Sequence, residues 1–201
     1  MNLSGLHTGL GTLLLAMAFG ASAADANRAL EIVQGKCFIC HGNEGESSSP
    51  LFPRLAGQHA GYVARQLADY KSGRRKSDTM RPMVEDLSGA DFAALGRYFE
   101  SRPPIAHEPL DGELAQVGRY IFNRGNAYSG IPSCASCHGG DGHGTDALPR
   151  LAGQHALYLE TQLKKFNSRE RTNDNAIMHS IASKLTELEA KAVSSYISGM
   201  K

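Results

Sequence analysis

The chain has 201 residues and a nearly balanced charge, with 21 Lys and Arg against 20 Asp and Glu. Because it has no excess of basic residues, nucleic acid is not expected as a partner. The length is enough for one ordinary domain or two small ones.

Residues 1–23 have the pattern of a secretory signal peptide. Leu10 to Phe19 is apolar with small residues mixed in, and Ala21-Ser-Ala23 has the A-x-A form of a cleavage site. The segment before this run carries only His7 as a basic side chain, which departs from the usual pattern. An uncleaved membrane anchor therefore stays open as an alternative, although the run falls short of the ~20 residues that span a bilayer. We expect an exported protein that begins at residue 24.

Two cysteine pairs are each followed directly by a histidine. The two motifs are Cys37-Phe-Ile-Cys40-His41 and Cys134-Ala-Ser-Cys137-His138. C-x-x-C-H is the attachment signal of a c-type haem, because two thiols three positions apart reach the vinyl groups of one porphyrin edge. The adjacent imidazole then lies beneath the iron. The motifs predict two covalently attached haem c groups.

Three other roles of paired cysteines fit less well. Cysteine pairs that bind zinc together usually lie about 15–20 residues apart, whereas Cys37 and Cys134 are 97 positions apart. A thioredoxin-like dithiol would sit in a βαβ pattern, which the sequence lacks. Disulfides are the third alternative, in an oxidising compartment.

The chain contains an internal duplication. Pro53–Ala60 reads PRLAGQHA, and Pro149–Ala156 repeats it letter for letter. The register continues beyond this segment, with Tyr62 opposite Tyr158, and the offset between the copies drifts only from 96 to 98 residues. Two copies are too few to stack into a solenoid, so the pattern indicates a duplicated domain.

A proline-rich segment separates the copies. Ser101–Pro109 contains three prolines, and proline interrupts helices and restricts the residue before it. The predicted organisation is a first domain over 24–101, a linker over 102–109 and a second domain over 110–201.

Each copy is predicted to be helical, because apolar residues recur at helical spacing. A first helix is expected over 27–35, with Leu30 and Val33 on one face. Its counterpart is expected over about 111–124, with an apolar stripe formed by Leu114, Val117 and Ile121.

The last helix of each copy has a recognisable start. Ser88 with Asp91, and Thr186 with Glu189, have the spacing of capping boxes. No convincing hairpin or alternating run is present in the sequence. The predicted fold class is all-α.

The second ligand of each iron decides its chemistry. His41 and His138 are the predicted first ligands. An open position opposite them would suit oxygen binding or peroxide chemistry, and a second protein ligand would leave electron transfer. A methionine thioether favours Fe(II) and raises the potential. The candidates are Met80 and Met83 in the first copy, and Met178 and His179 in the second.

Together these features resemble the dihaem cytochrome c4 family. The resemblance rests on two C-x-x-C-H motifs, on PRLAGQ after each of them and on a proline-rich linker. It also rests on a methionine in each copy, Met80 eight residues before Ser88 and Met178 eight residues before Thr186. It covers essentially the whole mature chain. It implies two tandem class I cytochrome c domains related by a pseudo-two-fold, with His/Met-ligated haems, in a periplasmic electron shuttle. It also implies that the carbonyls of Pro53 and Pro149 accept hydrogen bonds from the histidine Nδ1–H groups and so orient the rings.

The repeat chooses between the methionines of the first copy. Met80 and Met178 occupy the same register, whereas Met83 falls opposite Ile181, which cannot bind iron. Met80 and Met178 are therefore the predicted ligands, and Met83 is expected to pack against the haem.

Five other histidines have simpler predicted roles. His59 and His155 are expected as polar residues at the start of a helix, with bis-histidine ligation as the alternative. We expect none of these five to bind a metal: His59, His107, His143, His155 and His179.

The predicted function is that of an electron carrier rather than an enzyme. Electrons would pass one at a time from a quinol-oxidising complex or a dehydrogenase toward a terminal oxidase, with a peripheral position at the membrane left open. The alternative is a dihaem electron-transfer subunit of a periplasmic dehydrogenase that oxidises sulfide or another sulfur compound. A dihaem peroxidase is disfavoured, because that family is longer and leaves one haem accessible.

Overall fold

A computed structural model describes residues 23–109 and 111–201 of the chain. The predicted signal peptide therefore lies outside the described residues, except for its last position. Within the described residues there is no strand, only two isolated bridges, Arg75 to Arg171 and Asn126 to Ile131. The prediction of an all-α fold is confirmed.

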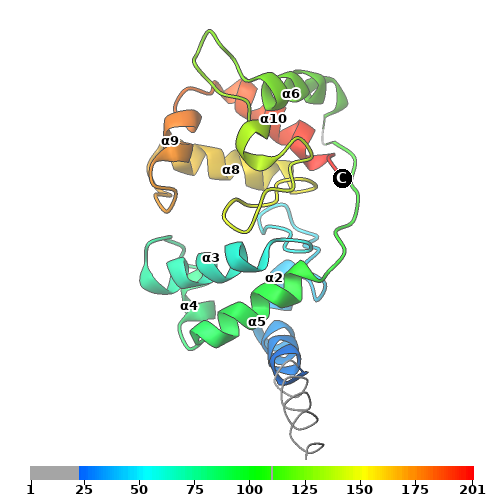
Figure 1. Cartoon of the computed structure of the whole chain (residues 1–201), viewed down its shortest axis with the longest axis vertical. Helices are drawn as coiled ribbons and strands as arrows, with labels where there is room; N and C mark the ends of the chain where they lie inside the picture. The colour runs from blue at the N-terminus through cyan, green and yellow to red at the C-terminus, as the bar shows by residue number, and fades with distance from the viewer. Residues whose placement is uncertain (1–22, 110) are drawn as a thin grey trace, which may run out of the picture.

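The helices form two successive groups (Figure 1). The first half has helical backbone over 23–32, followed by η1 Val33–Cys37, α2 Phe38–His41, α3 Ala60–Ser72, α4 Met80–Val84 and α5 Gly89–Glu100. The second half has α6 Gly112–Arg124, α7 Ala135–His138, α8 Ala156–Asn167, α9 Ile177–Ala182 and α10 Glu187–Ser198. None of the helices in the described ranges combines the length and apolarity needed to cross a membrane.

Each half has a hydrophobic core of its own. In the first, Leu95 and Phe99 of α5 are buried and share a cluster with residues of α3 and of the first helix. In the second, Phe122 of α6 packs with Val193 and Ile197 of α10. The two core clusters share no residue, as expected for duplicated units.

The predicted buried face of the first helix of each half is confirmed only in part: Val33 and Ile121 are buried, at 0% and 4%. Leu30 and Val117 are exposed, at 39% and 49%, whereas small residues such as Ala115 and Gly118 face the core. In the second half the reason is a close helix crossing: a Cβ at Gly118 would lie only 1.9 Å from the backbone oxygen of Ala192 in α10. Small residues allow this approach, and the bulky Val117 turns to solvent.

The caps of the last helices match the prediction. Ser88 and Asp91 form a capping box at the start of α5, and Thr186 and Glu189 form one at the start of α10. In addition, the side chain of Asp111 accepts a hydrogen bond from the third residue of α6. These bonds satisfy backbone N–H groups that have no partner within the helix.

The two halves meet through the repeated PRLAGQHA segments. The side chain of Gln58 donates to the backbone oxygen of Arg150 and accepts from its N–H, at 2.9 and 2.8 Å. Gln154 makes the same pair of bonds with the backbone of Arg54, both at 2.9 Å. The interface is therefore reciprocal, and the identical sequence of the two segments has a physical reason: each pairs with the other.

A second reciprocal contact links the two halves through Tyr62 of α3, Tyr158 of α8 and the arginines that follow these helices; Figure 1 draws α3 in one group of helices and α8 in the other. Arg75 donates to the hydroxyl of Tyr158, at 2.9 Å, and Arg171 donates to the hydroxyl of Tyr62, at 3.0 Å. Both guanidinium groups also donate to the side-chain oxygen of Gln162. These two buried arginines thus bind the halves together through neutral acceptors.

Candidate functional site

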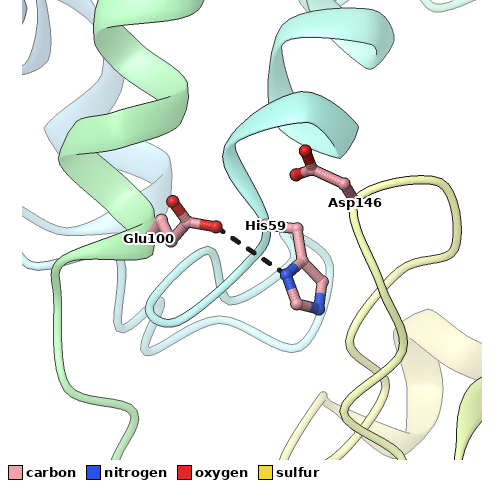
Figure 2. Close-up of side chains that lie close together, drawn as sticks. All are labelled: His59, Glu100 and Asp146. Carbon is pink, nitrogen blue, oxygen red and sulfur yellow. Dashed lines mark ion pairs between the residues drawn. The ribbon is translucent and has the colours of Figure 1, made fainter.

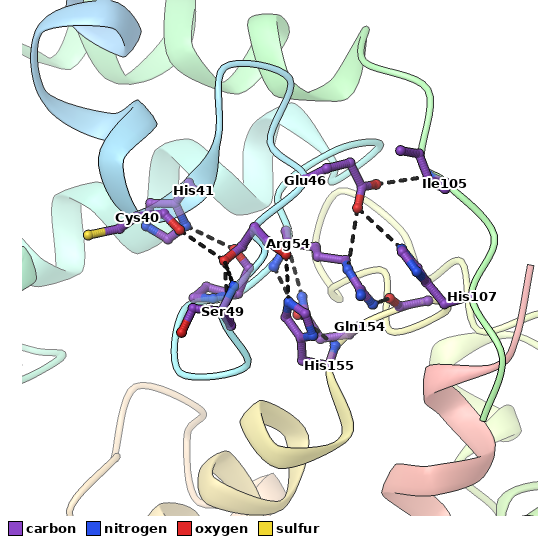
Figure 3. Close-up of polar contacts among 12 residues, drawn as sticks. Cys40, His41, Glu46, Ser49, Arg54, Ile105, His107, Gln154 and His155 are labelled. Carbon is purple, nitrogen blue, oxygen red and sulfur yellow. Dashed lines mark hydrogen bonds and ion pairs between the residues drawn. The ribbon is translucent and has the colours of Figure 1, made fainter. Parts of the chain in front are cut away.

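Each C-x-x-C-H motif ends in a buried histidine that is held by a proline. Nδ1 of His41, the last residue of α2, lies 2.9 Å from the carbonyl oxygen of Pro53 (Figure 3). Nδ1 of His138, the last residue of α7, lies 3.3 Å from that of Pro149. A carbonyl can only accept, so Nδ1 carries the proton in each ring and Nε2 keeps its lone pair.

Burial also fixes the charge of these rings. It lowers the pKa of both His41 and His138 below the ordinary value, and the hydrogen bond to the proline carbonyl opposes this only in part. The neutral form is therefore favoured near pH 7, and this is the form that binds a metal. Within the described residues, no hydrogen-bond partner is present at either Nε2.

No disulfide joins any of the four cysteines in this structure. Burial raises the pKa of Cys37 and of Cys134 to about 11. A redox dithiol depends on a lowered thiol pKa, so these values disfavour that role. In the described part of the chain, the one group of three donors close enough to share a metal contains no cysteine. That placement also disfavours a zinc site at the cysteines.

The chain reaches the two motifs by different routes. In the first half the opening helix continues through η1 into Cys37, whose thiol lies 3.7 Å from the backbone oxygen of Ile32. In the second half α6 ends at Arg124, and an irregular segment with the Asn126–Ile131 bridge leads to Cys134. The expected end of the first helix at residue 35 is therefore too early. A π-helical stretch of this kind is often found at functional sites.

The predicted methionine ligands occupy comparable places. Met80 opens α4 and is half-buried against the first core, and Met178 lies half-buried in the first turn of α9. Met83, one turn further along α4, is 40% exposed. His179 has a structural partner, since its Nδ1 lies 2.9 Å from the carbonyl oxygen of Phe166.

The histidines of the repeated segment, His59 and His155, form hydrogen bonds between the halves and do not pair as two ligands of one iron. His59 and His155 are the N-cap residues of α3 and α8. Nε2 of His59 donates to the backbone oxygen of His143, at 2.7 Å, and Nε2 of His155 donates to that of Ser47, at 2.9 Å. This placement gives no support to bis-histidine ligation.

Sequence reasoning missed a junction around Glu46. Its carboxylate accepts from the N–H of Ile105, at 2.9 Å, and lies 3.3 Å from both Arg54 and His107 (Figure 3). The linker between the halves is thereby tied to the first half. Glu46 lies in a polar loop with no periodicity. The one signal in the sequence that could have pointed to it is that the second copy has no equivalent glutamate.

Helices that end in buried, proline-held histidines directly after paired thiols provide a donor set that fits haem c, and they define the class of c-type cytochromes. The profile of the Cytochrome c family matches residues 115–201. Cytochrome c4 of Azotobacter vinelandii is 39% identical, over 95% of this chain and 94% of that protein. The crystal structure of reduced recombinant cytochrome c4 from Pseudomonas stutzeri superposes with a TM-score of 0.83 at 36% identity, covering 88% of this chain and 98% of the other.

The chain belongs to the cytochrome c4 family, as the motifs predicted. Membership identifies it as a dihaem electron carrier and implies haem c at the two motifs. A further relative is the thiosulfate dehydrogenase electron acceptor of Stutzerimonas stutzeri (strain A1501), which is 36% identical over 96% of this chain and 93% of its own length.

Proposed function

We propose that the protein carries electrons one at a time in the periplasm through two His/Met-ligated haems. The first domain, residues 24–101, would bind one haem, and the second, residues 110–201, the other, with 102–109 as linker. Thioether bonds would form at Cys37, Cys40, Cys134 and Cys137, and the axial pairs would be His41 with Met80 and His138 with Met178. When bound, each haem supplies a one-electron Fe(III)/Fe(II) couple.

One observation carries this assignment: the proline-held histidine at the end of each motif. The carbonyls of Pro53 and Pro149 fix the proton on Nδ1 of His41 and His138. Each ring therefore offers Nε2 to a metal, with its orientation already set. Such outer hydrogen bonds orient a ligand and raise its basicity.

The methionines give the second ligands their expected character. A thioether is soft and favours Fe(II), so His/Met ligation suits a carrier of relatively high potential. If a histidine and a methionine both bind each iron, peroxide could not reach it. We therefore infer electron transfer without turnover on a small substrate.

Two experiments test the ligation. The purified protein should contain two haems per chain and no titratable thiol after denaturation, because all four cysteines are in thioethers. The ferric protein should show the weak far-red band of a Met–Fe bond. Rapid turnover of peroxide by the native protein would contradict the proposal.

Point variants separate the candidate methionines. Met80→Ala and Met178→Ala should each remove half of the far-red band and lower the potential of one haem. Met83→Ala is the matched control, one turn away in the same helix, and should leave the band intact. If Met83→Ala removes half of the band and Met80→Ala does not, the repeat register has assigned the wrong residue.

The proposed acceptor is a terminal oxidase. The specific alternative is a role as acceptor for a thiosulfate dehydrogenase, favoured by the relative from Stutzerimonas stutzeri that carries this name. Stopped-flow mixing distinguishes the two roles. Fast reduction of this protein by thiosulfate and its dehydrogenase supports the alternative. Fast reoxidation of the reduced protein by oxidase-containing membranes, with no reduction by thiosulfate and its dehydrogenase, supports the first role.

A further inference from the structure

A histidine and two carboxylates converge where the two halves meet. His59 and Glu100 belong to the first half and Asp146 to the second (Figure 2). One ligand atom of each lies within 4.8 Å of the others. Nδ1 of His59 is 3.7 Å from Oε1 of Glu100. The cluster contains no residue of either C-x-x-C-H motif, and the electron-carrying function uses none of these residues.

The hydrogen bond of His59 determines which nitrogen faces the carboxylates. Nε2 donates to the backbone oxygen of His143, so in the neutral ring Nδ1 holds the lone pair. A metal-binding histidine almost always donates its other N–H to a carbonyl or carboxylate in this way. The ring is thus oriented with an acceptor nitrogen toward Glu100.

The separations fit a shared cation better than a direct contact. At 3.7 Å, Nδ1 of His59 and Oε1 of Glu100 are too far apart for a hydrogen bond. Two ligands about 2.0–2.2 Å from one zinc ion lie roughly 3.3–3.6 Å apart at the tetrahedral angle. Asp146 and Glu100 are partly exposed, so a small rotation can bring their oxygens to this spacing.

No basic side chain pairs directly with the carboxylates of the cluster, although Arg65 donates to the backbone oxygens of Asp146 and Ala147. In the described part of the chain, no Lys or Arg lies within ion-pair distance of Glu100 or Asp146. Each carboxylate accepts one backbone N–H at the start of α3, from Ala60 or Gly61. That leaves lone pairs on both carboxylates, and a divalent cation would neutralise their charge.

The duplicated chain provides an internal comparison. His155 occupies the same N-cap position and makes the same type of bond to a backbone oxygen across the interface. No carboxylate among the described residues lies within ion-pair distance of it, and nearby Glu46 is engaged by Arg54 and His107. The position matching Glu100 is Ser198. Among the described residues, such a cluster is therefore present at His59 and not at its counterpart His155.

We propose that His59, Glu100 and Asp146 bind a divalent transition-metal cation of the zinc type that links the two halves. Zinc accepts imidazole and carboxylate ligands together, and water can complete the four-coordinate shell. Calcium and magnesium prefer oxygen ligands alone, so they are not the expected occupants. This site changes the expectation that His59 has no metal role.

The test uses the mature protein with both haems, without a histidine tag and freed of metal by chelation. Calorimetric titration with zinc chloride should show one saturable site per chain. Glu100→Gln and Asp146→Asn should each weaken binding at least tenfold. The matched control His155→Gln should stay within twofold of wild type, as should Asp141→Asn, which removes the carboxylate 3.2 Å from His143.

Two further readouts identify the ligand atom and the link between halves. In the reduced, diamagnetic protein, zinc should shift the Nδ1 resonance of His59 and leave its Nε2–H bonded. Zinc should also raise the melting temperature of wild type but not of Glu100→Gln. No saturable zinc binding, equal affinity in Glu100→Gln, or binding that calcium displaces equally well would each overturn the proposal.

Discussion

Replacing Gln154 by leucine should loosen the contact between the halves. Gln154 is 7% exposed and makes two bonds to the backbone of Arg54, one from the side-chain nitrogen and one to its oxygen. Leucine has a similar volume but makes neither bond, so the N–H and the carbonyl of Arg54 lose their partners. A buried polar group left without a partner costs ~1–3 kcal/mol. Because Arg54 is only half-buried, we expect a total loss of about 2–3 kcal/mol.

The repeat supplies a matched test of this reasoning. Gln58→Leu removes the equivalent bonds to Arg150 and should cost a similar amount, whereas Gln116→Leu, on the exposed face of α6, should change stability by less than about 0.5 kcal/mol. Guanidinium unfolding of the holoprotein measures all three. In the variant with both glutamines replaced, the halves should unfold in two transitions and show separate rotational correlation times by NMR relaxation. Unchanged midpoints for both single variants would refute the argument.

Four further substitutions test the packing and the caps. Gly118→Ala should destabilise the second half by about 1–3 kcal/mol, because the added Cβ meets the backbone of α10 and overpacking has this cost. Thermal melting measures this loss, and an unchanged melting temperature would exclude a tight crossing of α6 and α10. Ser88→Ala and Thr186→Ala should each lower the unfolding free energy by ~1 kcal/mol through loss of a cap, as measured in guanidinium. The hydrogen bonds from Ser88, with a contribution from Arg28, lower the pKa of Asp91 to about 2. This carboxylate therefore stabilises the fold above its unfolded pKa of ~3.9 and loses that effect as pH falls toward 2, so Asp91→Asn should flatten the acid limb of the stability profile.

Local chemistry made much of the fold predictable. The C-x-x-C-H motifs and the capping boxes depend on residues close in sequence, so their spacing alone located the thiols, His41 and the start of α5. The register of the duplication then placed Met80 opposite Met178. These inferences need no knowledge of how the two halves are packed.

The interface could not be predicted in the same way. Val117 was assigned to the core because it fits the helical period, but the close approach of α10 at Gly118 decides which face is buried. The partners of Gln58 and Gln154 lie 92 and 100 residues away. No local pattern encodes such pairs. The letter-for-letter identity of the two segments indicates only that the same structural requirement acts on both, without saying that they pair with each other.

The same interface makes the two halves electrostatically unequal. Arg54 and Arg150 each follow the proline that holds a motif histidine, but only Arg54 has a carboxylate, Glu46, at ion-pair distance among the described residues. Asp141 and Glu46 act on Arg150 only from beyond ion-pair distance. A positive charge that is less closely compensated favours the Fe(II) state, because the ferric centre carries one more positive charge. The haem of the second half should therefore have the higher potential. Glu46→Gln should raise the potential of the first haem and narrow the gap between two voltammetric waves, whereas an unchanged or wider gap would mean that the Arg54–Glu46 pair does not set the difference.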